Sequence, residues 1–166
     1  WDINFVPEVT RLIKREYGVD INEAGDEMTQ SLIITEHFKN INNHNNQSRS
    51  SILDRCIIDG LIYTDWLERN KGLRSWCSAY AYHVFDKYIT SYDVIFYTNA
   101  SDVKIEDDGE RSVDVRFRNN IIAGFSDWIT NNPRVRDRVV VLSGTVEERL
   151  ETIKKTLTEK GLDINI

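Results

Sequence analysis

The sequence predicts an α/β domain built on a parallel sheet. Short apolar runs, such as DVIFYT at 93–98 and RVVVLS at 138–143, alternate along the chain with longer segments of helical periodicity. Successive residues of these runs are apolar, rather than every second residue. This pattern is typical of strands buried on both faces of a parallel sheet. Strands that are separated by helices are the usual pattern of α/β domains.

Length and composition fit a single domain of this kind. The 166 residues are 40% hydrophobic, enough for one substantial core, and 21 Lys plus Arg against 27 Asp plus Glu give a net charge of -6. That charge disfavours a broad nucleic-acid surface. Cys56 and Cys77 lie in apolar surroundings, far apart in the sequence, so we expect free thiols in a reducing compartment. No apolar run reaches the roughly 18 to 20 residues of a membrane span, so we expect a cytoplasmic protein without a membrane partner.

Periodicity and helix-boundary residues place each element. Pro7 suits the first turn of a helix, Gly18 suits the end of one, and Thr145 with Glu148 forms a capping box. Apolar residues recur at helical spacing in the long segment that begins near Met28. In chain order we expect a strand at 3–5, a helix at 8–17, a long helix at 28–41, a loop at 42–50, a strand at 50–54, helices at 59–70 and 73–89, a strand at 93–98, a loop or lid at 99–112, a helix at 115–129, a strand at 138–143 and a terminal helix ending near 161.

The residues that follow the strands are the candidate site. In a parallel sheet, ligands bind beyond the carboxyl ends of the strands. This rule places on one rim the residues after the first, second, third and fourth strands, which are Glu8, Asp54 with Arg55, residues 99–101, and Ser143 with Gly144.

The Asp54-Arg55 pair has the chemistry of a phosphoryl-transfer site. An Asp at a strand end can accept a proton from a hydroxyl, and a neighbouring Arg can neutralise a phosphate. The alternative is a structural role, as a salt bridge at the strand end or a helix cap.

A second candidate segment is DDGERSVDVRFRNN at 107–120. Its arginines Arg111, Arg116 and Arg118 follow an acidic turn that contains a glycine, and guanidinium groups bind phosphate oxygens in bidentate fashion. The alternative is a solvated loop of mixed charge that leads into a helix. The three histidines have no metal-ligand spacing, so we expect no metal site among them.

Taken in order, several segments resemble the NadR-like P-loop kinases and ATPases, over nearly all 166 residues. They are VPEVTR, SILDRCIIDGLIYTDWL, YDVIFYTNAS, DDGERSVDVRFR and VVVLSGTVEERLETI. The most specific parts are D-R-x-x-x-D-x-x-x-Y from Asp54 to Tyr63 and R-x-x-D-x-x-x-R from Arg111 to Arg118. The resemblance implies a three-layer P-loop NTPase-type parallel sheet with helices on both faces. It also implies ATP and Mg²⁺ as cofactors, and phosphoryl transfer to a small nucleoside, nucleotide or nicotinamide-riboside-like acceptor.

The resemblance also implies residue roles. Asp54 would orient or deprotonate the acceptor hydroxyl, and Arg55 would bind a phosphate. Arg111 and Arg118 would be lid arginines, in a lid at about 101–118, that clamp the donor phosphates. The residues that would bind the acceptor are Glu8, Arg11, Asp59 and Tyr63. Gly144 would lie near the adenine.

The sequence departs from that family in one respect. A P-loop kinase needs G-x-x-x-x-G-K-[ST] to hold the phosphates and Mg²⁺, and this chain contains no Gly-Lys dipeptide. In the family that loop follows the central strand, upstream of the helix at 8–17. We therefore expect a single domain that is incomplete at its N-terminus. The alternatives are an NTPase or kinase acting on modified DNA bases, and a non-catalytic interaction protein on the same fold.

Overall fold

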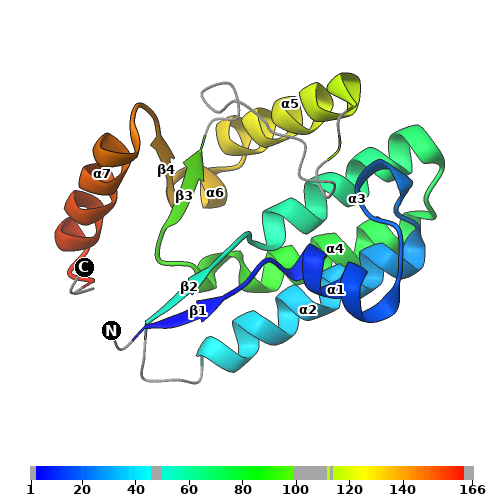
Figure 1. Cartoon of the computed structure of the whole chain (residues 1–166), viewed down its shortest axis with the longest axis horizontal. Coiled ribbons are helices and arrows are strands. Elements are labelled where there is room, and N and C mark those ends of the chain that lie inside the picture. The colour runs from blue at the N-terminus through cyan, green and yellow to red at the C-terminus, as the bar shows by residue number, and fades with distance from the viewer. Residues whose placement is uncertain (1–2, 46–49, 99–111, 113, 163–166) are drawn as a thin grey trace.

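The structure is a computed structural model that describes residues 3–45, 50–98, 112 and 114–162. It contains four short strands and seven helices among these residues, with short 3₁₀ turns at Asn22–Ala24 and Ile89–Ser91 (Figure 1). In chain order the elements are β1 (Asn4–Val6), α1 (Val9–Tyr17), α2 (Glu27–Asn45), β2 (Ser51–Leu53), α3 (Ile57–Lys71), α4 (Ser75–Tyr88), β3 (Ile95–Thr98), α5 (Val115–Asn131), α6 (Pro133–Arg136), β4 (Val139–Leu142) and α7 (Val146–Glu159).

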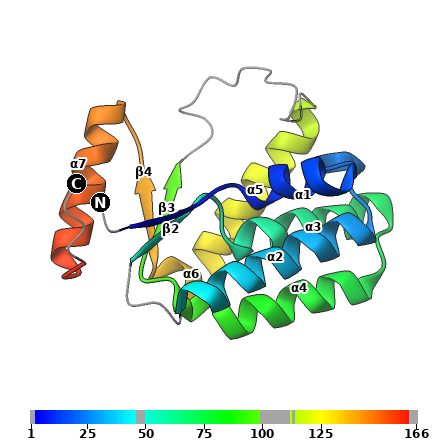
Figure 2. The same cartoon turned by 60° about the horizontal axis from the view of Figure 1, so that its bottom comes forward.

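The strands form two parallel pairs. β1 pairs with β2, and β3 pairs with β4, so each pair is a separate two-stranded sheet (Figures 1 and 2). Parallel pairing agrees with the apolar strands of the sequence. The single continuous sheet does not form within the described residues, because no ladder joins β2 to β3.

A helical layer made by α2, α3 and α4 carries most of the core. The three helices pack against one another and lie side by side in Figure 2. Leu61 of α3 is fully buried between them, and burying such a side chain contributes roughly 1.5–3 kcal/mol. α2 and α3 approach closely at Gly60, where an added Cβ would lie 3.6 Å from the His37 ring. Other buried members of this cluster are Ile34, Ile57, Ile62, Ala81, Val84, Phe85 and Ile89.

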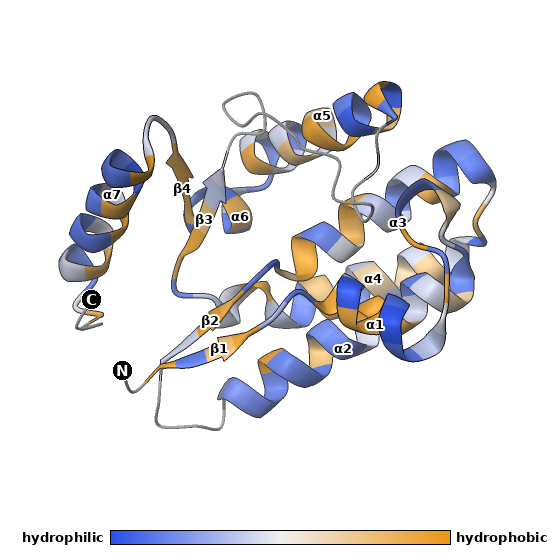
Figure 3. Ribbon diagram, in the orientation of Figure 1, coloured by the Kyte–Doolittle hydropathy of each residue, from blue (hydrophilic) through white to orange (hydrophobic). Residues whose placement is uncertain are grey.

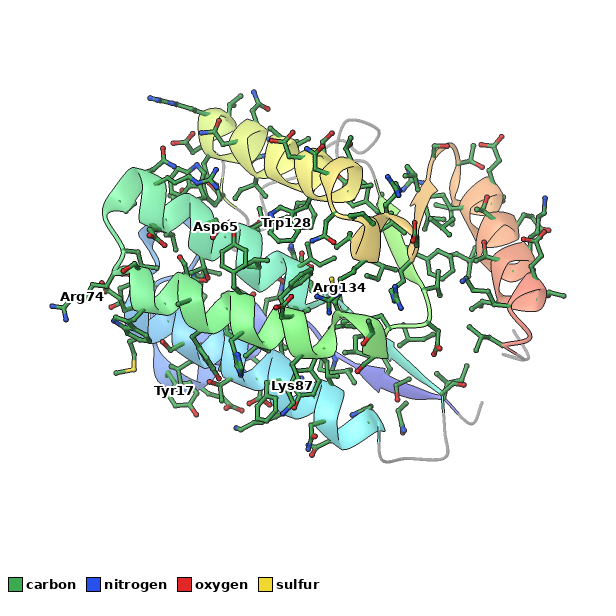
Figure 4. All side chains as sticks on the ribbon, turned by 180° about the vertical axis from the view of Figure 1, so that it is seen from behind. Tyr17, Asp65, Arg74, Lys87, Trp128 and Arg134 are labelled. Atoms are coloured by element: carbon green, nitrogen blue, oxygen red, sulfur yellow. The ribbon has the colours of Figure 1, made fainter. Side chains whose placement is uncertain are left out.

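The helices α5 and α6 attach to α4 through aromatic and ionic contacts. The Trp128 ring of α5 packs edge-on against Phe85, with 4.9 Å between ring centroids. Arg134 of α6 pairs with Asp86 of α4 at 2.6 Å. Figure 4 shows both Trp128 and Arg134 turned toward α4. Phe117 and Ile121 join the main core, so α5 is anchored at both ends.

Most predicted elements are confirmed, and some boundaries differ. α2 continues to Asn45, into the segment predicted as a loop, because Ile41 packs in the core and the next turn extends the helix from it. Pro7 precedes α1, and Gly18 ends it with φ +64°. The predicted lid at 99–112 lies outside the described residues except for Ser112. Cys56 and Cys77 are free thiols, as expected. Among the described helices, none combines the length and apolar character that a bilayer span requires.

The predicted capping box of α7 is formed. The Thr145 hydroxyl accepts from the Glu148 amide at 3.3 Å, and the Glu148 carboxylate accepts from the Thr145 amide at 2.7 Å. We expect Thr145→Ala to lower the free energy of unfolding by about 1 kcal/mol, because an orphan amide loses its partner. Urea denaturation measures this loss. Thr158→Ala near the other end of α7 is the control, and an equal loss in both variants would contradict a capping role.

Candidate functional site

The candidate site lies where β1 and β2 end. Val6 pairs with Leu53 across the two parallel strands, so their carboxyl ends lie together. Glu8 follows β1, and Arg55 follows β2. Arg55 Nε lies 3.1 Å from Glu8 Oε1, which confirms that the residues after these two strands meet on one rim.

Arg55 is held on two sides by carboxylates. Its Nη1 donates to Asp59 Oδ1 at 3.2 Å, one helical turn away in α3. Glu8 also accepts from Arg11 Nε at 2.9 Å, on the next turn of α1. Burial disfavours a charged guanidinium, but Asp59 and Glu8 outweigh it and raise the pKa of Arg55. The network therefore holds a permanently charged guanidinium at the rim, balanced by the two carboxylates.

The backbone at Arg55 is strained. Its φ is +76°, in the left-handed region that costs a non-glycine residue roughly 1–2 kcal/mol. The strand ends and the helix begins within this turn, since Asp59 Oδ2 accepts from the Cys56 amide at 2.9 Å. A further hydrogen bond reaches the start of α3, where the Ile57 amide donates to the Tyr92 hydroxyl at 3.2 Å. The arginine conformation is therefore determined by several contacts around it.

A cavity of about 1050 Å³ opens beside this network. Its lining includes six of the predicted residues, which are Glu8, Arg11, Arg55, Asp59, Tyr63 and Arg118. Tyr63 packs edge-on against Phe117, with 5.6 Å between centroids, and burial raises the pKa of its hydroxyl. Phe117 is buried in the first turn of α5 and thus brings the neighbouring Arg118 to the cavity from a distant part of the chain.

Three predicted residues are not brought together with the others. The Asp54 side chain is exposed and does not line the cavity in the described structure, although its amide donates to Val6 O at 2.9 Å. Gly144 is exposed at the start of the α7 cap and also does not line the cavity, and its carbonyl accepts from Arg149 Nε. Arg111 lies outside the described residues.

Sequence reasoning missed other residues of the site. Asn22, with φ +58°, lines the cavity after α1, and no local pattern in the VDIN segment singled it out. Tyr92 lines the cavity through a tertiary contact that leaves no local signal. The Ser112 hydroxyl donates to Glu23 Oε1 at 2.8 Å, joining the end of the predicted lid to the turn after α1.

The described residues offer no obvious metal site. None of their His, Cys, Asp and Glu side chains form a group of three or more that could hold an ion. The carboxylates of Glu8 and Asp59 are directed at arginines and a backbone amide instead.

Comparison with protein-family models, with curated proteins and with solved structures finds no match to this chain. The resemblance to the NadR-like kinases therefore stays a hypothesis, supported by the residues of the chain itself.

The role of Asp54 as acceptor base stays a prediction, and its exposure makes it easy to test. We expect Asp54→Asn to lower phosphoryl transfer by about 10²-fold or more, because a positioned general base contributes on that scale. Binding of ATP and the melting temperature should stay unchanged. Asp127→Asn, at an exposed acid of α5 that does not line the cavity in the described structure, is the control. Full activity in Asp54→Asn would remove the residue from the mechanism.

Proposed function

We propose that the protein is an enzyme for ATP-dependent phosphoryl transfer. The acceptor is a small nucleoside, nucleotide or nicotinamide-riboside-like molecule, and the reaction is placed in the cytoplasm, in line with two free cysteines. The observation that carries the proposal is the guanidinium of Arg55, fixed between Glu8 and Asp59 at the mouth of a large cavity.

The chemistry follows from the charges at this mouth. Phosphoryl transfer needs positive groups held in place where negative charge accumulates, since catalysis rests on positioning and electrostatic stabilisation. Arg55 is held by two partners, so little reorganisation is needed when a phosphate arrives. Arg118 offers a second guanidinium on the same cavity. Tyr63 and Phe117 provide an aromatic wall against which a planar base can pack.

The residues fit the two cofactors unequally. Arg55 and Arg118 are suited to phosphate oxygens of ATP, which would supply the transferred group. The described residues do not fit Mg²⁺, because no group of acids is arranged to hold it and the sequence has no P-loop hydroxyl. No step is therefore assigned to the metal.

Two other functions compete with this one. An NTPase or kinase that acts on modified DNA bases would use the same arginines, although the net charge of -6 disfavours a polymeric acceptor. A non-catalytic interaction protein would keep the fold without nucleotide. Calorimetric titration of Mg-ATP into the protein in its native full-length form separates the classes. We expect heat of binding and a rise in melting temperature. The absence of both would contradict the two enzyme functions and favour the non-catalytic interaction protein.

Arg118 provides the sharpest test of the lid. We expect Arg118→Ala to lower kcat by about 10²–10⁴-fold, the scale of losing a group that stabilises developing charge, with little change in melting temperature. Arg116→Ala is the matched control, because Arg116 is exposed on the same helical turn and does not line the cavity in the described structure. Unchanged turnover with a large drop in melting temperature would assign Arg118 a structural role.

A further inference from the structure

The outer edge of β4 has unused backbone groups. Within the described residues β4 pairs with β3 alone, and it lies on the far side of β3 from β2 (Figures 1 and 2). Ile95 pairs with Val139, and the Ile95 amide donates to Arg138 O at 2.8 Å. Backbone groups of successive residues in a strand point to opposite sides, so Val140 faces β3 as Arg138 does. The N–H and C=O groups of Val139 and Val141 therefore point away from β3.

This edge lacks the features that usually keep a strand edge unpaired. Natural edge strands are protected by a charged residue, a proline, a bulge or a covering element. The sequence of β4 is Val-Val-Val-Leu, and its register with β3 runs without a bulge. Val141 is 52% exposed. Figure 3 shows β4 as an apolar strand beside hydrophilic residues of α6 and α7. The edge is therefore able to pair with another chain.

The charges before and after β4 are opposite in sign. The segment 134–138, before the strand, carries three arginines and one aspartate. The segment 146–151, which begins α7 after the strand, carries three glutamates and one arginine. Arg136 and Glu147 are both exposed. Such a strand is complementary to a copy of itself in the antiparallel direction, because each basic segment then lies beside an acidic one. In the parallel direction like charges would meet.

We propose that the β4 edge is a dimer interface, in which β4 pairs antiparallel with β4 of a second copy of this protein. Val139 would lie opposite Val141 of the second copy, with the two-fold axis at Val140. The two such pairs would exchange four backbone hydrogen bonds. The exposed Val141 would pack beside Val139 across the interface, because directly opposed residues share one face of a sheet. Two-fold dimers are the commonest assemblies of soluble proteins, and each contact in them occurs twice.

The same pairing brings Arg136 of each copy toward Glu147 of the other. In this register the position opposite Arg136 is Gly144, and α7 begins two residues further on. The partner of Arg136 within its own chain is Asp137, at 3.5 Å on the surface, and such exposed pairs contribute little. The interface would therefore have an apolar centre and a charged rim, which is the usual arrangement between proteins.

Charge exchange tests the proposal with the native full-length protein. Sedimentation equilibrium over a series of concentrations measures the dissociation constant of the dimer. We expect Arg136→Glu and Glu147→Arg each to weaken the dimer by at least about 10-fold, because each brings like charges together at two places. The double variant Arg136→Glu/Glu147→Arg restores opposite charges, so its dissociation constant should return to within about 3-fold of the original. Arg69→Glu, on α3, is the control, because it changes the net charge as much as Arg136→Glu does.

A proline tests the backbone pairing separately. Val141→Pro removes an N–H that points away from β3, so the ladder between β3 and β4 stays complete and the monomer should remain folded. We expect this variant to be monomeric, with an unchanged circular dichroism spectrum. Hydrogen exchange in the unmodified protein gives an independent readout. Raising the concentration should slow amide exchange at Val139 and Val141 but not at Val140, whose amide already faces β3.

The outcomes that would overturn this dimer are distinct. One is a protein that stays monomeric at every concentration. Another is a dimer that survives Val141→Pro, and a third is a double charge variant that binds no better than the single ones. None of these measurements uses ATP, so failure here is distinct from failure of the proposed phosphoryl transfer.

Discussion

Arg55→Ala is expected to lower the rate of phosphoryl transfer by about 10³–10⁵-fold, the range for an arginine that stabilises charge in this reaction. The variant removes the guanidinium that Glu8 and Asp59 hold at the cavity mouth. It also leaves two half-buried carboxylates close together without their shared partner, so the network changes from balanced charge to net negative charge, which disfavours an incoming phosphate. Transfer from Mg-ATP to the best acceptor of the unmodified protein, measured as kcat and kcat/KM, gives the size of the effect.

The backbone at Arg55 provides a matched control. Arg55→Gly removes the same guanidinium but relieves the left-handed conformation at φ +76°. We expect both variants to lose activity equally, and the glycine variant to be more stable than the alanine variant by about 1 kcal/mol. Arg69→Ala, which removes an exposed partner of Asp65, should change neither quantity. Full turnover in Arg55→Ala would contradict the role of the network.

Local signals predicted much of this fold. Pro7, Gly18 and the Thr145 capping box located helix boundaries because each acts through its own backbone or a neighbour within one turn. The contact between Arg55 and Asp59 is equally local, since residues four apart at the start of a helix lie on the same side, but only the family pattern singled out Asp59 in the sequence. Placing Glu8 beside Arg55 required one further inference, that the two apolar strands pair in parallel. The structure confirms both the pairing and the contact.

Tertiary features were less accessible to sequence reasoning. Asp54 and Arg55 are neighbours, yet the turn at Arg55 leaves Asp54 exposed while Arg55 points to the cavity mouth. Nothing in the residue types reveals that turn, because a positive φ at an arginine is imposed by surrounding contacts. The division of the strands into two pairs was equally hidden, since an apolar strand signals burial and not the identity of its neighbours.

His37 is expected to make the protein strongly sensitive to mild acid. The side chain is 2% exposed between α2 and α3, and burial lowers its pKa to about 4, with Asp59 opposing and Arg55 assisting the shift. The folded state thus keeps His37 neutral, whereas the unfolded chain takes up a proton below its ordinary pKa of 6.5. This contribution to stability is fully present above about pH 6.5 and is lost as the pH falls toward 4, by about 3 kcal/mol in all.

A difference measurement isolates this contribution from the general protonation of carboxylates. Urea denaturation between pH 7 and pH 4 should show a smaller acid-induced loss of unfolding free energy in His37→Gln than in the unmodified protein, because glutamine binds no proton in either state. His83→Gln, at an exposed histidine on α4, is the control for the substitution itself. Parallel curves of unfolding free energy against pH for His37→Gln and the unmodified protein would contradict this prediction. They would show that His37 takes up a proton in the folded state as readily as in the unfolded chain. Because Asp59 also binds Arg55, such a proton would couple the stability of the core to the charge of the candidate site.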